Sequence, residues 1–169
     1  RLPGPARWAR APRAKAIRRA EKVVRGDGWL CLVPQLDGKL AAYGTAVRML
    51  QLAPMADGSA LGLPHPRAAV RIGKIEGSTV EVEVIEESSA KVPVALGKAV
   101  ERAIQLLPEL REPVTWSAEE LRKSADPAQL LAWQIDVSPE HCQLYLADGD
   151  AGARMAVLVD ALELILSAE

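Results

Sequence analysis

The sequence predicts an α+β fold, in which antiparallel β-hairpins form a mixed-order sheet covered by about four helices. Several short apolar segments are separated by turn dipeptides, which is typical of strands joined in hairpins. Other segments carry apolar residues three and four positions apart, as on one face of a helix. Because the predicted strands come in pairs and do not alternate singly with helices, antiparallel pairing is favoured over a doubly wound parallel sheet.

The composition is that of a globular domain with its own core. Of the 169 residues, 49% are hydrophobic and 25% are charged, and the absence of Phe leaves mainly aliphatic side chains for the interior. Cys31 and Cys142 are too few for a disulfide scaffold, so we expect buried free thiols. No stretch approaches the roughly 18 uninterrupted apolar residues of a membrane span. We therefore expect a cytoplasmic protein, or an organellar one after removal of a targeting segment.

The charges divide the chain into two parts. Residues 1–26 carry nine Lys/Arg and one acidic residue, a net charge of +8. Residues 27–169 carry the other 12 basic and 21 acidic residues, a net charge of −9. This asymmetry predicts a basic N-terminal arm and helix over 1–26, followed by an α+β domain over 27–169. The turn-rich segment 54–66 is a candidate division between two sub-lobes of that domain.

The N-terminal segment is expected to be extended first and helical afterwards. Pro3, Pro5 and Pro12 prevent a continuous helix over residues 1–12, because proline lacks an amide hydrogen and restricts the residue before it. Residues 13–25 show helical spacing of apolar side chains among basic ones, and a glycine follows the run. The sequence therefore predicts an arm that leads into a short basic amphipathic helix.

A first hairpin is predicted from residue 29 to residue 52. Strands over 29–36 and 40–52 flank Asp37-Gly38, a dipeptide that tolerates the positive φ angles of a two-residue turn. The following segment 54–66 contains three prolines and two glycines, so we expect a long loop there.

A second hairpin is predicted over residues 68–85. Strands over 68–75 and 79–85 flank the turn sequence Glu76-Gly77-Ser78. The second strand alternates strictly, which predicts one apolar face and one solvated face. The apolar face would carry Val80, Val82 and Val84, and the solvated face Glu81 and Glu83.

The C-terminal half is predicted to contain three helices and one more pair of strands. Helical spacing predicts a helix from Pro93 to residue 107, and a capping box at Ser117 predicts another through residue 125. Apolar runs over 130–137 and 141–147 resemble strands joined by a turn. The final helix is expected over residues 151–168.

The basic N-terminal segment is the first candidate binding site. Clustered cations neutralise phosphates, and Arg makes bidentate contacts, so nucleic acid or another anionic partner is one interpretation. The other is a solvated segment, or one docked against the acidic remainder of the chain. The candidate residues are Arg7, Arg10, Arg13, Lys15, Arg18, Arg19, Lys22 and Arg25.

Catalytic and metal sites have weaker support. His141 and Cys142 combine a base with a nucleophile, but neighbouring residues of a strand point to opposite faces, which disfavours activation of the thiol. The chain has two Cys and two His but none of the paired short spacings of zinc sites, and Asp148 and Asp150 fit a helix cap better than a calcium loop. No catalytic residue, metal or cofactor is therefore predicted.

The last helix is apolar over more than one stripe, so it is either central to the fold or presents a face to a partner. These observations lead to one main functional hypothesis, a non-catalytic interaction or adaptor domain that binds another protein or a second copy of itself. Nucleic-acid binding through the basic segment and an enzyme with a Cys142/His141 site are the alternatives. The candidate self-association residues are Met155, Val159, Leu162 and Leu166.

Overall fold

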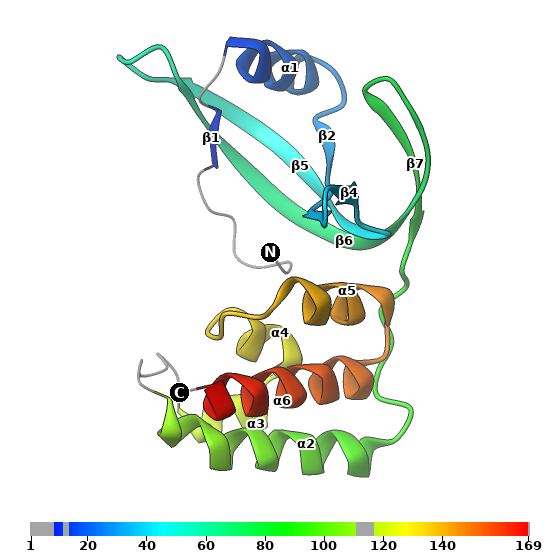
Figure 1. Cartoon of the computed structure of the whole chain (residues 1–169), viewed down its shortest axis with the longest axis vertical. Helices are drawn as coiled ribbons and strands as arrows, with labels where there is room; N and C mark the ends of the chain where they lie inside the picture. The colour runs from blue at the N-terminus through cyan, green and yellow to red at the C-terminus, as the bar shows by residue number, and fades with distance from the viewer. Residues whose placement is uncertain (1–8, 12–13, 111–116, 169) are drawn as a thin grey trace.

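The computed structural model describes residues 9–11, 14–110 and 117–168, and Figure 1 shows their arrangement in two parts. The first part, here called the sheet lobe, contains β1 (Ala9–Ala11), α1 (Ala14–Arg25), β2 (Trp29–Leu32), β3 (Gln35–Leu36), β4 (Lys39–Leu40), β5 (Tyr43–Pro54), β6 (Ala60–Glu76) and β7 (Thr79–Val84). The second part, the helical lobe, contains α2 (Pro93–Leu106), the short 3-10 helix η1 (Leu107–Glu109), α3 (Ala118–Lys123), α4 (Pro127–Ala132), α5 (Pro139–Ala147) and α6 (Ala151–Ala168).

The sheet is antiparallel and is built around β6. Its strand order is β1-β6-β5-β2, and β7 also pairs with β6. Strand β1 pairs with the beginning of β6 and β7 with its end, while β5 runs along the other side. Helix α1 packs against β5 at the end of the lobe away from the helical lobe (Figure 1). The arrangement confirms the predicted α+β class with antiparallel hairpins.

The loop predicted over residues 54–66 is wrong for most of its length, because β6 begins at Ala60. Pro64 and Pro66 lie within β6, opposite Met49 and Val47 of β5. In the described strands this stretch of β6 has a neighbour on one side only, since β1 and β7 pair with other parts of it. Proline lacks a donor and is tolerated where one edge of a strand is open.

Both predicted hairpin turns are present. Asp37 and Gly38 have φ angles of 50° and 76°, and this turn joins β3 to β4. The long strands predicted on either side are interrupted, so β2 pairs with β5 and the turn itself belongs to a small two-stranded ribbon. In the second hairpin Glu76 pairs with Thr79 and Gly77 has a φ of 60°, as expected for the turn between β6 and β7.

The strands predicted over 130–137 and 141–147 are wrong, because these regions form α4 and α5. Each helix has a proline in its first turn and a capping side chain before it. Asp126 accepts a hydrogen bond from the amide of Gln129 at 2.9 Å, and Ser138 accepts one from the amide of His141 at 3.3 Å. These caps satisfy backbone donors that a helix leaves free at its start, and they outweigh the strand-like apolar runs.

The other predicted helices are confirmed as α1, α2, α3 and α6. At the start of α3 the capping box is complete, since Ser117 accepts from the Glu120 amide while the Glu120 carboxylate accepts from the Ser117 amide at 2.6 Å. With α4 and α5 added, the described chain has six α-helices where about four were expected.

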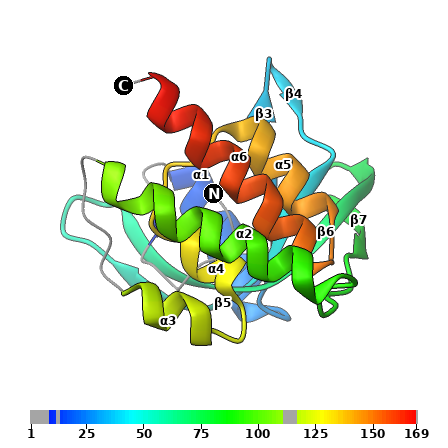
Figure 2. The same cartoon turned by 90° about the horizontal axis from the view of Figure 1, so that it is seen from below.

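The main core lies in the helical lobe around α6. Figure 2 shows α6 beside α2, and the helix also packs against α4 and α5. This central position explains why α6 is apolar on more than one side. The largest fully buried side chains of the helical lobe are Leu121, Leu131, Tyr145, Met155, Leu158 and Leu162.

The two lobes are joined by the segment 85–92, which is held against the start of α6. The Ser88 amide donates to the Gly149 carbonyl at 2.8 Å, and the Lys91 amide donates to the Asp150 carboxylate at 2.7 Å. The buried guanidinium of Arg154 donates to the Asp148 carbonyl at 2.6 Å and forms an ion pair with Glu87 at 2.8 Å. The linker is therefore ordered by backbone and charged contacts.

A further contact joins the lobes directly. The Gln143 side chain on α5 accepts from the Tyr43 amide at 2.9 Å and donates to the Tyr43 carbonyl at 3.0 Å. Ala69 of β6 is fully buried within the same apolar cluster as the helices. One face of the sheet thus packs on the helical lobe, and the helical lobe does not cover the opposite face.

Candidate interaction surface

An apolar face is exposed on the hairpin formed by β6 and β7. Paired residues of neighbouring strands place their side chains on the same face, and the pairs Ile72–Val82 and Ile75–Val80 are both apolar. Val82 and Val84 are 41% and 57% exposed. We call Ile72, Ile75, Val80, Val82 and Val84 the valine face.

The valine face continues across the sheet through a glycine. A Cβ atom on Gly44 would lie 3.3 Å from Ile72 Cδ1 and 3.4 Å from Cys31 Sγ, so these side chains flank Gly44. It would also lie 2.7 Å from the Leu32 carbonyl oxygen, which requires glycine at this position. The apolar surface therefore extends from β7 towards β2.

The opposite face of the same hairpin is acidic. Glu81 and Glu83 are exposed, and Glu83 lies 3.5 Å from Arg71. Glu81 has no ion-pair partner among the described residues. Strict alternation predicted one buried and one solvated face, but every β7 residue except the half-buried Val80 is exposed. The pairing was predicted from the sequence, whereas the exposure of the valine face was not.

The predicted basic site is only partly placed by the structure. Arg7 and Arg13 lie outside the described residues, Arg10 belongs to β1, and the backbone of Lys15 and Arg19 lies in α1. The remaining three residues, Arg18, Lys22 and Arg25, are exposed on α1 and have no ion-pair partner in the described part of the chain.

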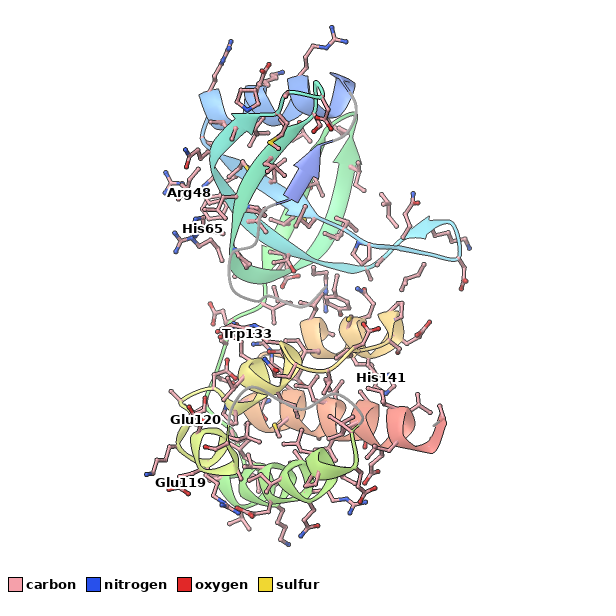
Figure 3. The ribbon with its side chains drawn as sticks, turned by 90° about the vertical axis from the view of Figure 1, so that its left-hand side faces the viewer. Arg48, His65, Glu119, Glu120, Trp133 and His141 are labelled. Carbon is pink, nitrogen blue, oxygen red and sulfur yellow. The ribbon has the colours of Figure 1, made fainter. Side chains whose placement is uncertain are left out.

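A second candidate binding site, with one aromatic side chain and two basic ones, lies on the sheet near the end of α1. Trp29 pairs with Arg48, and Arg48 pairs with His65, so the three side chains form a row across β2, β5 and β6. Figure 3 shows Arg48 and His65 next to each other at the side of the sheet lobe, and Trp29 is 47% exposed. The sequence gives no local signal for this row, because its members meet only through strand pairing.

The His141/Cys142 pair does not form a nucleophilic site in the described structure. Both residues lie on α5, and His141 Nδ1 is 2.9 Å from Ser138 Oγ. The Cys142 thiol points to the Val137 carbonyl at 3.6 Å, and burial raises the pKa of this thiol. A raised pKa keeps the thiol protonated at neutral pH, which opposes nucleophilic attack.

Metal binding also lacks a site in the described ranges. They contain no group of three or more His, Cys, Asp or Glu residues placed to hold a metal ion. Asp150 instead caps α6, where its carboxylate accepts from the Ala153 amide at 2.9 Å. Hydrogen bonds from the amides of Lys91 and Ala153 lower the Asp150 pKa.

The candidate self-association residues face the protein's own core. Met155 and Leu162 are fully buried, Val159 is buried, and Leu166 packs against the same cluster half-buried. The side chains proposed for a contact with a second copy therefore contact the neighbouring helices of the monomer.

Comparison with known proteins identifies the fold. No protein-family model matches the chain, and no curated protein matches its sequence. The N-terminal domain of the Mycobacterium avium complex Lon protease is similar in structure, with a TM-score of 0.67, 18% identity and coverage of 96% of this chain and 92% of that one. A Lon N-terminal domain protein from Xanthomonas campestris has a TM-score of 0.65 and 20% identity, covering 98% and 90% of the two chains.

These similarities extend over both lobes. At such low identities they establish a shared fold and transfer no residue roles to this chain. Among the described helices, none has the length and apolar character needed to cross a membrane.

Proposed function

We propose that this chain is a non-catalytic interaction domain that binds other proteins through the valine face. The observation that carries the proposal is the exposure of Val82, Val84 and Ile75 on one side of a hairpin whose sequence alternates as if that side were covered. A contiguous exposed apolar surface is favourable to bury, and such surfaces typically mark sites of protein contact.

Two further observations support this function. The side chains considered for a catalytic or metal site have structural roles instead, since Ser138 and Asp150 cap helices and Cys142 is buried. Binding therefore accounts for the exposed apolar surface better than catalysis does. One similar structure is described as the N-terminal domain of a Lon protease and the other as a Lon N-terminal domain protein, and neither description names a catalytic domain. The free thiols of Cys31 and Cys142 support a reducing compartment such as the cytoplasm.

Replacing two residues of the valine face is expected to weaken binding to a partner. An unfolded polypeptide that exposes apolar side chains, such as reduced and alkylated lactalbumin, is a suitable probe. Fully burying a valine contributes about 1.5 kcal/mol or more, so the double variant Val82→Ser/Val84→Ser should lose about tenfold or more in affinity. Fluorescence anisotropy of the labelled probe measures the change.

The chain offers a matched control for this experiment. Val92 and Val94 are also two valines separated by one residue and are 59% and 69% exposed, but they lie at the start of α2. The variant Val92→Ser/Val94→Ser should bind like the wild type. Val92 is the N-cap of α2, where serine is favourable, and Val94 is an exposed residue of its first turn. Equal loss in both double variants, or no binding by the wild type, would contradict the proposal.

Binding of single-stranded nucleic acid is a second candidate function. It is favoured by the row Trp29, Arg48 and His65, which lies close to the exposed cations of α1. Aromatic rings stack on bases, and cations neutralise the phosphates along the strand. The acidic remainder of the chain opposes a large polyanion, so any such contact would be confined to this end of the sheet lobe.

This candidate predicts a steep dependence on salt. Affinity for a labelled single-stranded oligonucleotide should fall as salt rises, because bound counterions are released from the phosphates. The variant Lys22→Glu/Arg25→Glu should lose about tenfold or more at low salt, since each phosphate contact contributes to the binding. Lys91→Glu/Lys98→Glu, which changes exposed cations of the linker and of α2, is the control. A titration with no binding at low salt would eliminate this function.

A further inference from the structure

We infer that β7 binds an extended polypeptide segment in which apolar and basic side chains alternate, and that this segment adds to the sheet as a further strand. The inference rests on the proposed function and specifies the chemistry of the partner. It follows from three features of β7, namely its open edge, its valine face and its acidic face.

The first feature is a row of backbone groups on the open edge. In the described structure β7 pairs with β6 only. The Ile85 amide donates to the Ala69 carbonyl at 2.9 Å, so residue 85 directs its backbone groups towards β6. These directions alternate along an antiparallel strand, which turns the N–H and C=O groups of Val82 and Val84 away from β6. They are the groups that a further strand would pair with.

The edge lacks several of the features that usually block such pairing, and its only charges are the acidic side chains Glu81 and Glu83. Natural edge strands carry Pro, Lys or a bulge that twists them away from other chains. Strand β7 has the sequence TVEVEV, without proline or lysine, and the described bulge lies on β6 between Ile72 and Ile75. Six residues of strand are long enough to pair with a bound segment.

The second and third features define the side chains of the partner. A strand added to β7 places alternate side chains beside the valine face and the others beside Glu81 and Glu83. Apolar residues extend the valine face, and opposite charges across a strand pair are favourable. Glu81 has no ion-pair partner among the described residues, so a basic side chain would meet an available carboxylate.

A second copy of the chain fits this edge less well. If two β7 strands paired antiparallel about Val82, Glu81 of one copy would lie opposite Glu83 of the other, and the reverse pair would form as well. Like charges directly opposite each other are destabilising. The acidic face therefore selects against self-pairing and in favour of a basic partner.

Synthetic peptides test this inference directly. A labelled ten-residue peptide of alternating valine and lysine should bind the full chain, and the same peptide with glutamate in place of lysine should bind at least tenfold more weakly. Hydrogen exchange of the Val82 and Val84 amides should slow when the first peptide is bound. Equal binding of the two peptides, or unchanged exchange at both amides, would overturn the inference.

Two variants separate the backbone contribution from the side chain. Val82→Pro removes an edge donor and leaves the ladder to β6 intact, so the valine-lysine peptide should bind at least tenfold more weakly. Val82→Thr keeps the amide and the branched side chain and should change affinity less than threefold. Far-UV circular dichroism checks that both variants are folded. Equal affinities of the two variants would show that no strand is added.

A charge variant gives a test that leaves the backbone unchanged. Glu81→Lys should weaken binding of the valine-lysine peptide and strengthen binding of the valine-glutamate peptide, each severalfold. Asp160→Lys, at an exposed position on α6, should alter neither. If Asp160→Lys has the same effect as Glu81→Lys, the attraction comes from net charge and the inference fails.

The results also distinguish this inference from the proposed function. If Val82→Pro still binds unfolded lactalbumin as well as the wild type, the chain binds proteins but not through the β7 edge. If the wild type binds neither the unfolded protein nor the peptide, both are wrong. A dimer in light scattering that Val82→Pro dissociates would assign the edge to a second copy and overturn the inference.

Discussion

Replacing Gly149 by alanine is expected to destabilise the protein by about 3 kcal/mol, at the upper end of the cost of overpacking a well-packed site. A Cβ atom at this position would overlap with the carbonyl oxygen of Glu86 and lie 2.9 Å from its carbon. The obstacle is backbone and cannot rotate away. The Ser88 amide donates to the Gly149 carbonyl, so relief would have to separate the linker from the start of α6. Urea unfolding followed by tryptophan fluorescence measures the effect.

Gly97 provides the control for this substitution. It lies in α2, and a Cβ atom there would meet no atom within 4 Å. Alanine within a helix is more favourable than glycine by roughly 0.5–1 kcal/mol, so Gly97→Ala should stabilise the protein. Similar free energies of unfolding for the two variants would contradict the close contact between the linker and the start of α6.

Truncating Leu158 is expected to cost about 2–5 kcal/mol of stability, because alanine leaves a cavity in a packed core. Leu158 is fully buried in α6, the helix that packs against α2, α4 and α5. The same urea titration gives the difference in the free energy of unfolding.

A leucine on the outside of the same helix serves as the comparison. Leu164 is 54% exposed, so Leu164→Ala should change the stability by about 0.5 kcal/mol or less. If Leu164→Ala is as destabilising as Leu158→Ala, α6 is not packed in the orientation described. The pair of variants also tests whether the C-terminal helix serves the monomer core.

The stability and binding predictions concern different parts of the molecule. The core side chains lie mainly in the helical lobe, whereas the valine face belongs to a hairpin at the edge of the sheet. Substitutions at Val82 and Val84, which are 41% and 57% exposed, remove less buried area than substitutions in the core, so they should affect binding more than folding. This separation makes the proposed surface accessible to mutagenesis in a folded protein.

Much of the fold was predictable from local signals. The Asp37-Gly38 turn, the Ser117 capping box and the spacing of α2 each depend on residues close together in sequence. Turn conformation, helix capping and amphipathic period are set by neighbours within about four residues, so they can be recognised without a structure.

The secondary structure predicted from the sequence was wrong where two signals in the same segment favoured different structures. Residues 139–147 are apolar enough for a strand, but Ser138 as cap and Pro139 in the first turn start a helix. The prolines of segment 54–66 favour a loop, yet pairing with β5 makes most of it a strand. In both places a competing interaction, a cap in one and strand pairing in the other, determined the structure.

The sequence by itself determined that the chain is α+β, that it has hairpins and helices at most of the expected positions, and that β7 has an apolar and an acidic face. Only the tertiary structure decided which apolar faces are covered. Met155 and Leu162 of α6 are buried in the monomer, while Val82 and Val84 remain exposed. Periodicity shows that a face is apolar, but its burial depends on elements distant in the chain, and these contacts have no local signature.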